Sequence, residues 1–266
     1  MKYLYLSLLS LLVVYLLVVI FIYFNQRNLL YHPGDNNYLD DKVQFSYKEV
    51  LIEVDQDIQL KSWLIEKDLK KYKTLVFFHG NAGNLFNRVH KLNELHKLEI
   101  NILIISWRGF SGNLGKPTEK NFYQDAQKSI EWLNSKGIES KKIILYGESL
   151  GTGVAVELAQ KNIFNSIILE SPFTSMAKTA KIYYPYLPVN LLLKDKYDSI
   201  NKIHKITKPI LIMHGVKDDL VPYIMSVELF NKANEPKYSF FPKDDNHMMD
   251  FNDKLLNKIR LFIKQH

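Results

Sequence analysis

The sequence predicts a chain of the α/β class, with a mainly parallel twisted sheet, helices on both faces, and one transmembrane helix before the domain. Short apolar runs alternate with helical stretches from residue 74 to the C-terminus, which is typical of a parallel sheet covered by helices. The apolar runs hold few polar residues, as expected of strands buried on both faces. With 266 residues, 47% of them hydrophobic, the chain can bury the core of one such domain.

The N-terminus is predicted to anchor the chain in a membrane. Residues 3–24 contain no charge and no proline, and these 22 residues match the roughly 20 that cross a bilayer as a helix. A cleaved signal peptide has a shorter apolar region and small residues at its cleavage site, whereas this run ends in Phe24-Asn25-Gln26-Arg27. We therefore expect a single-pass anchor over residues 1–27 and one globular domain over residues 28–266. Lys2 and the terminal amine outweigh Arg27 and slightly favour a non-cytoplasmic domain.

The elements of the domain follow in order. Two strands, 45–54 and 58–66, flank the sequence DQD, which predicts a tight turn and an antiparallel N-terminal hairpin at one edge of the sheet. Further strands are predicted over 74–78, 100–107, 142–146, 166–170, 209–214 and 238–241, and helices over 85–98, 120–136, 150–161, 223–233 and 251–264. In such sheets the chemistry lies at the carboxyl ends of the strands. The loops after the strands are therefore the places to search.

Composition excludes several functions. The net charge of +7 comes from 35 basic residues interleaved with 28 acids, without a basic cluster or a recognisable binding motif, so we expect no nucleic-acid partner. The absence of cysteine excludes disulfides, thiolate catalysis and Cys-ligated metals. The stretch GNLGKPT (112–118) lacks the first glycine of a phosphate loop, and Pro117 follows its lysine. We expect neither a metal nor a cofactor.

Residues 147–151, GESLG, match the G-x-S-x-G nucleophile elbow, in which a strand turns sharply into a helix and presents a serine. The glycines are needed because side chains beside the serine would collide with the neighbouring strand and helix. The alternative is a glycine-rich turn with an idle serine. A predicted strand before Gly147 and a predicted helix after Ser149 favour the elbow.

A serine nucleophile requires a base and an orienting carboxylate, which this type of fold supplies later in the chain, the acid first. Asp218 follows the strand at 209–214, and His247 follows the last strand. Asp219 is a close rival, but Asp218 lies nearer the strand end. The alternative for His247 is a surface histidine on a polar loop. His79 and His214 are interpreted as structural histidines.

The tetrahedral intermediate of acyl transfer requires two N–H donors. The residue after the nucleophile, Leu150, supplies one backbone N–H. The small residues after the strand at 74–78, Gly80-Asn81-Ala82-Gly83, allow a second backbone to approach, and Asn81 is the candidate.

Taken together, these motifs resemble the α/β-hydrolase superfamily, and more narrowly its membrane-anchored alpha/beta-hydrolase domain-containing protein 13-like branch. The similar stretches are FFHGNAGN (77–84), SWRGFSGNLGKPTEKNFYQDA (106–126), YGESLGTGVAVELA (146–159), SPFTSM (171–176), KPILIMHGVKDDLVP (208–222) and NH (246–247). The resemblance implies an α/β-hydrolase fold and the same assignment of Ser149, Asp218 and His247, with Asn81 and Leu150 as oxyanion donors. The sequence departs at Ser106-Trp107, where Asp-Tyr is usual, and at Asp245-Asn246, where a small residue usually precedes the histidine. Arg108 is interpreted as a structural ion-pair partner.

The segment 172–208 is too long for a plain connection and is predicted to form a short helical lid. Its apolar residues are expected to form the wall of an acyl-chain site, with Tyr183, Tyr184 and Leu187 as the substrate-binding residues and Tyr186, Leu191 and Leu192 beside them. Alternatively, these residues only pack a helix pair onto the domain. The expected function is cleavage of an acyl ester or thioester carried by a lipid, a protein or a small molecule. A serine peptidase of the same fold and a non-catalytic membrane interaction protein are the alternatives.

Overall fold

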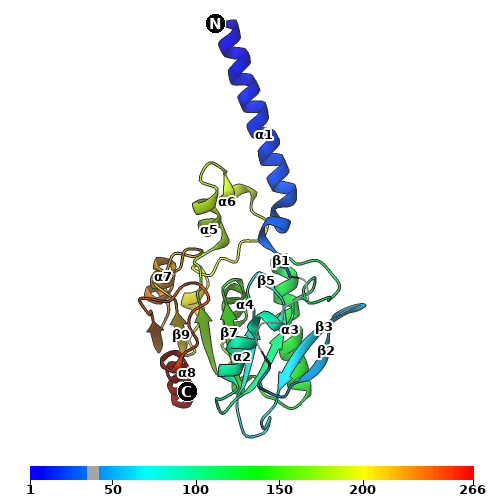
Figure 1. The fold of residues 1–266 in the computed structure, drawn as a ribbon, viewed down its shortest axis with the longest axis vertical. Helices are drawn as coiled ribbons and strands as arrows, with labels where there is room; N and C mark the ends of the chain where they lie inside the picture. The colour runs from blue at the N-terminus through cyan, green and yellow to red at the C-terminus, as the bar shows by residue number, and fades with distance from the viewer. Residues whose placement is uncertain (35–41) are drawn as a thin grey trace.

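The computed structural model describes residues 1–34 and 42–266, so residues 35–41 of the predicted domain lie outside the description. A long helix, α1 (Lys2–Leu30), projects from one end of an α/β domain, and the C-terminal helix α8 (Asp253–Gln265) lies at the opposite end (Figure 1). α1 is long and apolar enough to cross a membrane. It continues three residues beyond the predicted anchor boundary at residue 27.

An eight-stranded sheet forms the centre of the domain, in the order β10-β9-β8-β7-β4-β6-β3-β2. The hairpin β2–β3 forms the edge and pairs antiparallel to β6, whereas all other neighbours in the sheet are parallel. The predicted fold class and its antiparallel edge are therefore confirmed. The strands are β2 (Lys48–Asp55), β3 (Ile58–Ile65), β4 (Thr74–Phe78), β6 (Asn101–Ile105), β7 (Ile143–Glu148), β8 (Ser166–Glu170), β9 (Ile210–Met213) and β10 (Lys237–Phe240).

Helices cover both faces of the sheet because side chains alternate across each buried strand. On β4, Val76 and Phe78 belong to one core cluster, while Leu75 and Phe77 belong to the other. The first cluster includes side chains from α3 (Glu119–Ser135), α4 (Leu150–Ala159) and α7 (Ile224–Lys232). The second includes side chains from α2 (Val89–Leu95) and α8.

Polar side chains set where several helices begin. Thr118, before α3, accepts a hydrogen bond from the N–H of Asn121, and Asn252, before α8, accepts from Lys254 and Leu255. The helix predicted over 85–98 is divided and ends earlier. Asn84 and Asn87 form a capping box that starts the 3₁₀ turn η1 (Leu85–Arg88), and α2 follows it.

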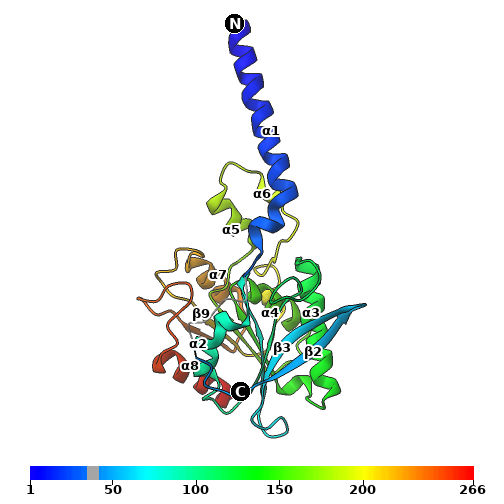
Figure 2. The ribbon, with the colours of Figure 1, turned by 45° about the vertical axis from the view of Figure 1, so that its right-hand side comes forward.

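The lid segment, residues 172–208, contains three short helical elements: α5 (Met176–Tyr183), α6 (Val189–Leu192) and the 3₁₀ turn η3 (Ile203–Lys205). α5 and α6 lie beside the C-terminal part of α1 in both ribbon views (Figures 1 and 2). The short helical lid predicted from the sequence is therefore present.

A two-stranded parallel pair joins the end of α1 to the loop after β4. In it β1 (His32–Pro33) pairs with β5 (Ala82–Gly83), and the N–H of His32 donates to the carbonyl of Asn81 at 2.8 Å. Two-residue strands carry no detectable periodicity, so sequence analysis did not predict this pair. Its consequence is that the chain after α1 is fixed to the loop that carries Asn81.

Candidate active site

Ser149 lies at the turn between β7 and α4 with backbone angles φ 50° and ψ −117°, in a region that residues other than glycine seldom adopt. The neighbouring glycines allow this turn. A Cβ added at Gly151 would lie 2.0 Å from the carbonyl oxygen of Phe78, and one at Gly147 would lie 2.5 Å from the Cα of Thr152. The local geometry is therefore that of the predicted elbow, with the serine held in a strained conformation by close backbone packing.

The structure brings together the three side chains that sequence analysis placed at strand ends. The Nε2 atom of His247 lies 2.9 Å from Ser149 Oγ, and its Nδ1 atom lies 2.6 Å from Asp218 Oδ2. Asp218 and not Asp219 meets the histidine. The other oxygen of Asp218, Oδ1, accepts hydrogen bonds from the N–H groups of Leu220 and Val221 at 2.8 Å.

Asp218 has a second histidine partner that sequence analysis did not assign to it. The Nε2 atom of His214 lies 2.8 Å from Asp218 Oδ2 and 2.9 Å from the carbonyl oxygen of Val221. Both neighbours are acceptors, so Nε2 carries the hydrogen. Burial by itself raises the pKa of Asp218, but the hydrogen bonds from His214 and His247 outweigh it and hold this pKa far below its usual value. Asp218 is therefore an ionised carboxylate at neutral pH.

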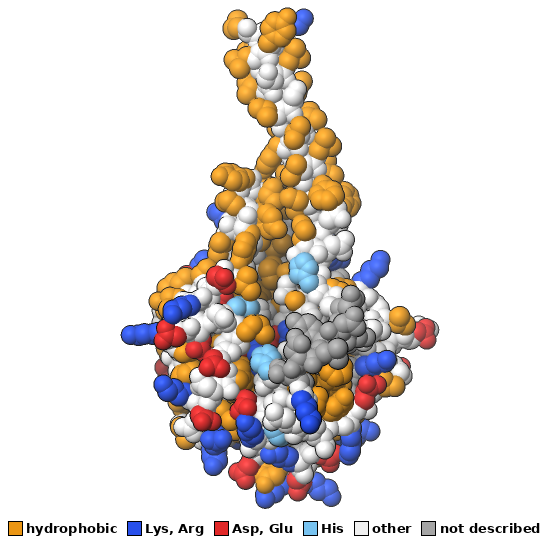
Figure 3. Space-filling model, in the orientation of Figure 1, with side chains coloured by type: hydrophobic (Ala, Val, Ile, Leu, Met, Phe, Trp, Pro, Cys, Tyr) orange, Lys and Arg blue, Asp and Glu red, His pale blue; other side chains and the backbone are white. Residues whose placement is uncertain are grey.

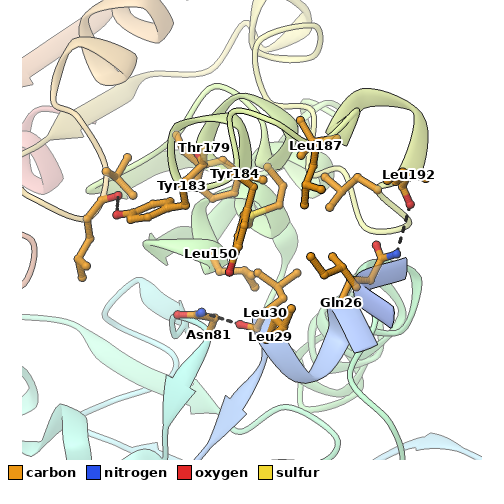
Figure 4. A pocket seen from close by; sticks show the side chains of 18 of the residues that line it. Gln26, Leu29, Leu30, Asn81, Leu150, Thr179, Tyr183, Tyr184, Leu187 and Leu192 are labelled. Carbon is orange, nitrogen blue, oxygen red and sulfur yellow. Dashed lines mark hydrogen bonds between the residues drawn. The ribbon is translucent and has the colours of Figure 1, made fainter. Parts of the chain in front are cut away.

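The two expected oxyanion donors both line the space in front of Ser149. Within residues 1–34 and 42–266, no acceptor is found for the backbone N–H of Asn81 or of Leu150. The side chain of Asn81 instead donates to the carbonyl oxygen of Leu30 at 2.6 Å, which ties this loop to the end of α1 (Figure 4). Both N–H groups are free to bind a ligand oxygen.

His79 and Arg108, which sequence analysis interpreted as structural residues, both have buried polar partners. His79 is fully buried, its Nδ1 atom lies 2.8 Å from the carbonyl oxygen of Gly80, and burial lowers its pKa to about 3. Arg108 forms a buried ion pair with Asp125 at 2.5 Å. Neither side chain lines the cavity at Ser149.

Four buried charged side chains lie on the interior side of the elbow, and we call them the buried ion cluster: Arg88, Lys91, Glu148 and Glu170. Lys91 Nζ lies 2.7 Å from Glu148 and 2.5 Å from Glu170, and Arg88 lies 2.6 Å from Glu148. Burial raises the pKa of Glu148 by itself, but its two cationic neighbours hold that pKa well below its usual value.

The buried ion cluster connects the elbow to the Asn81 loop. Glu148, the residue before Ser149, accepts from the N–H of Gly80, while Arg88 donates to the carbonyl oxygen of Ala82 at 2.7 Å. Sequence analysis missed this cluster. The available signals were the glutamates at the ends of two otherwise apolar strands, β7 and β8.

On the outer side of Ser149 lies a cavity of about 340 Å³, which we call the apolar pocket. It is lined by Ser149, His247, Asn81 and Leu150, by lid residues that include Tyr183, Tyr184, Leu187 and Leu192, and by the α1 residues Ile22, Tyr23, Gln26, Leu29 and Leu30. Across it, Tyr184 and Leu187 face Gln26, Leu29 and Leu30 (Figure 4). None of its described lining residues is Asp, Glu, Lys or Arg.

The lid residues proposed for substrate binding divide into two sets. Tyr183, Tyr184, Leu187 and Leu192 line the apolar pocket, whereas Tyr186 and Leu191 do not, contrary to expectation. Tyr186, in the turn between α5 and α6, is 87% exposed, and Leu191, within α6, is 84% exposed. The contribution of α1 to the pocket was also missed, because an apolar helix is interpreted first as an anchor.

Comparisons with known proteins agree with the fold and the motifs. The model of the prolyl oligopeptidase family matches residues 108–256. An uncharacterized protein of Mycobacterium tuberculosis is 33% identical over 255 residues, covering 93% of this chain and 90% of its own. Protein bem46 of Schizosaccharomyces pombe is 31% identical, with 87% and 83% covered, and human alpha/beta hydrolase domain-containing protein 17B is 31% identical, with 72% and 66% covered.

The solved structure of the Pyrococcus furiosus esterase Pf2001 superposes with a TM-score of 0.71 at 21% identity, covering 89% of this chain and 97% of its own. Est1E from Butyrivibrio proteoclasticus superposes with a TM-score of 0.68 at 18% identity, covering 81% and 98%. At these identities the likeness concerns the fold. The chain belongs to the prolyl oligopeptidase family, which lies within the α/β-hydrolase superfamily that its motifs predicted, and is a hydrolase by family.

Proposed function

We propose that the protein is a membrane-anchored serine hydrolase that cleaves acyl esters or thioesters through Ser149, His247 and Asp218. The observation that carries this proposal is the continuous hydrogen-bonded line from Ser149 Oγ through the His247 ring to Asp218, with contacts of 2.9 and 2.6 Å. This line converts a weakly acidic alcohol into a nucleophile, because the histidine accepts its proton and the carboxylate orients the ring.

The chemistry follows from these positions. His247 Nε2 takes the proton of Ser149 as Oγ bonds to the acyl carbon, and the N–H groups of Leu150 and Asn81 stabilise the oxyanion. The bond to the leaving oxygen or sulfur breaks, and His247 returns the proton to the departing alcohol or thiol. A water molecule then repeats the sequence, which releases the carboxylic acid and restores Ser149.

The apolar pocket favours an acyl substrate over a peptide. A site that binds a peptide terminus pairs its charge with a side chain of opposite sign, and the described residues lining this pocket offer none. A serine peptidase remains the second candidate because the matching family is named for oligopeptidases. Release of nitroaniline from short peptide nitroanilides by the wild type, and not by Ser149→Ala, would favour the peptidase.

The anchor is proposed as an uncleaved part of the folded protein. Gln26 and Arg27 of α1 form hydrogen bonds with the lid residues Leu192, Lys194 and Asp195, which removal of α1 would eliminate. Tethering raises the concentration of the site near membrane-bound substrates.

Labelling by a fluorophosphonate probe tests the proposal. The full-length protein in detergent micelles is expected to be labelled, Ser149→Ala to be unlabelled, and the surface control Ser135→Ala to be labelled like the wild type. Labelling of Ser149→Ala equal to that of the wild type contradicts the assignment. Absence of both labelling and short-chain nitrophenyl ester hydrolysis favours the non-catalytic alternative.

A further inference from the structure

α1 forms part of the wall of the apolar pocket. Ile22, Gln26 and Leu29 lie four and three residues apart, so they share one face of α1, and all three line the cavity that contains Ser149. A tether that only held the domain near a membrane would not contribute side chains to the site.

The position of α1 against the domain is fixed by specific contacts. The side chain of Gln26 donates to the carbonyl oxygen of Leu192 (Figure 4). It also accepts from the N–H of Lys194 at 2.8 Å. Arg27 forms an ion pair at 2.8 Å with Asp195, which also accepts from the N–H of Glu119 at the start of α3. These contacts hold the pocket face of α1 toward Ser149.

The lid segment extends along α1 beyond these contacts. The hydroxyl of Tyr15 donates to the carbonyl oxygen of Tyr186 at 2.9 Å. Tyr15 precedes Gln26 by 11 positions, or roughly 16 Å along a helix. When residues 3–24 cross a bilayer, the turn at Tyr186 therefore lies within the leaflet next to the domain.

The lid tip, residues 182–192, has a surface suited to that environment. Tyr186 and Leu191 are almost fully exposed, and Ile182 is half-exposed, beside the apolar surface of α1. In Figure 3 hydrophobic side chains continue from α1 onto the adjoining part of the domain. Residues 171–194 include Lys178, Lys181 and Lys194 but no acid, which complements anionic headgroups.

We infer that the lid tip enters the leaflet with α1 and that the apolar pocket opens between them, so that an acyl chain reaches Ser149 laterally from the bilayer. The substrate class is an amphiphile whose long acyl chain is already held in the membrane. The inference rests on the proposed hydrolase function and adds the route and the class of substrate. Ile22 and Leu29 of α1 then help to determine acyl-chain specificity.

The route is tested by two tryptophan substitutions on α1. Ile22 lines the apolar pocket, whereas Ile20 is 52% exposed, does not line it and lies about 200° away around the helix. Each full-length variant in phosphatidylcholine vesicles is assayed with nitrophenyl hexadecanoate in the bilayer and nitrophenyl acetate in water. These esters share the same leaving group.

We expect Ile22→Trp to lower the ratio of long-chain to short-chain hydrolysis about tenfold, and Ile20→Trp to leave the ratio at the wild-type value. Equal ratios for the two variants overturn the route. Absence of acetate hydrolysis and probe labelling in the wild type would instead overturn the hydrolase itself. The substrate class is tested with a hexadecanoyl glycerol ester and with a hexadecanoyl thioester of a vesicle-bound peptide. Hydrolysis of at least one of them supports a membrane-held acyl substrate. If the protein hydrolyses neither, the proposed substrate class is overturned.

The depth of the lid tip is tested independently. Because the chain has no cysteine, a fluorophore can be attached at Tyr186→Cys alone, with Leu261→Cys on α8 as the exposed control. Lipids carrying a nitroxide in the acyl chain are expected to quench the label at 186 and not the label at 261. Equal quenching at the two positions overturns the insertion of the lid tip.

Discussion

The two sides of Ser149 differ in chemistry and in packing. On its interior side, the buried ion cluster places two cations against two carboxyl groups with almost no exposure to water. On its outer side, the apolar pocket is lined largely by apolar side chains from the lid and α1. Fully paired buried charges demand one geometry, whereas apolar contacts tolerate rearrangement. We infer that the interior side positions the proposed nucleophile and that the outer side accommodates the substrate.

The largest expected effect comes from the polar partners of the nucleophile. Asp218→Asn keeps the shape of the side chain but removes the charge that stabilises protonated His247, and we expect kcat on a short ester to fall on the order of 10⁴-fold. The measurement is steady-state hydrolysis of nitrophenyl acetate. Asp219→Asn is the matched control, because His247 bonds to Asp218 and not to Asp219. Similar losses of kcat in the two variants would contradict the assignment of Asp218 as the carboxylate that orients His247.

The buried ion cluster is expected to have the largest effect on folding. Lys91→Met leaves Glu148 and Glu170 with a single cation in the interior, and breaking a buried pair in this way costs about 3–5 kcal/mol of unfolding free energy. Lys97→Met is the control, because Lys97 pairs with Glu94 at the surface, where such a change is worth about 0.5 kcal/mol or less. Urea unfolding in micelles gives both values. Equal midpoints would show that the cluster does not hold the fold.

Asp218 also predicts how stability depends on pH. Its pKa is lowered by folding, so its ionised form stabilises the protein above the pKa of an unfolded aspartate, about 3.9, and this contribution is lost as pH falls toward the lower folded value. We expect the stability advantage of the wild type over Asp218→Asn to shrink between pH 5 and pH 3, measured by urea unfolding. An advantage that stays constant across this range would contradict a lowered pKa.

The smallest effect is expected on the apolar side. Tyr183→Phe removes a hydroxyl that donates to the carbonyl oxygen of Leu220 at 2.7 Å, at a site that is half-exposed. Stability should change by less than about 0.5 kcal/mol. The measurement is thermal unfolding, in which Tyr183→Phe is compared with the control variant Tyr184→Phe. A loss of unfolding free energy as large as that of Lys91→Met would contradict the inferred difference between the interior and outer sides of Ser149.

The sequence predicted the parts of the site that follow from strand order. Ser149, Asp218 and His247 each come just after an apolar run, and parallel strands bring their carboxyl ends to one edge of the sheet. The glycines of the elbow gave a second signal, because only a close backbone approach requires them at 147 and 151.

What the sequence did not reveal depends on contacts between distant segments. Lys91 and Arg88 lie in a helical stretch where a basic residue is ordinarily exposed, and nothing local shows that they meet Glu148. Likewise, an apolar run such as residues 3–24 is the same whether it passes freely through a bilayer or forms one wall of a pocket. The sequence also does not show which lid residues face the apolar pocket, as Leu187 does, and which face away from it, as Tyr186 does.

The proposed mechanism requires Ser149 to carry the acyl group during turnover. Rapid-quench mass spectrometry of the full-length protein mixed with nitrophenyl hexadecanoate in vesicles tests it most directly. We expect a transient hexadecanoyl mass on the peptide that contains Ser149 in the wild type, and neither this mass nor turnover in Ser149→Ala. Turnover of the ester by Ser149→Ala at the wild-type rate would contradict it.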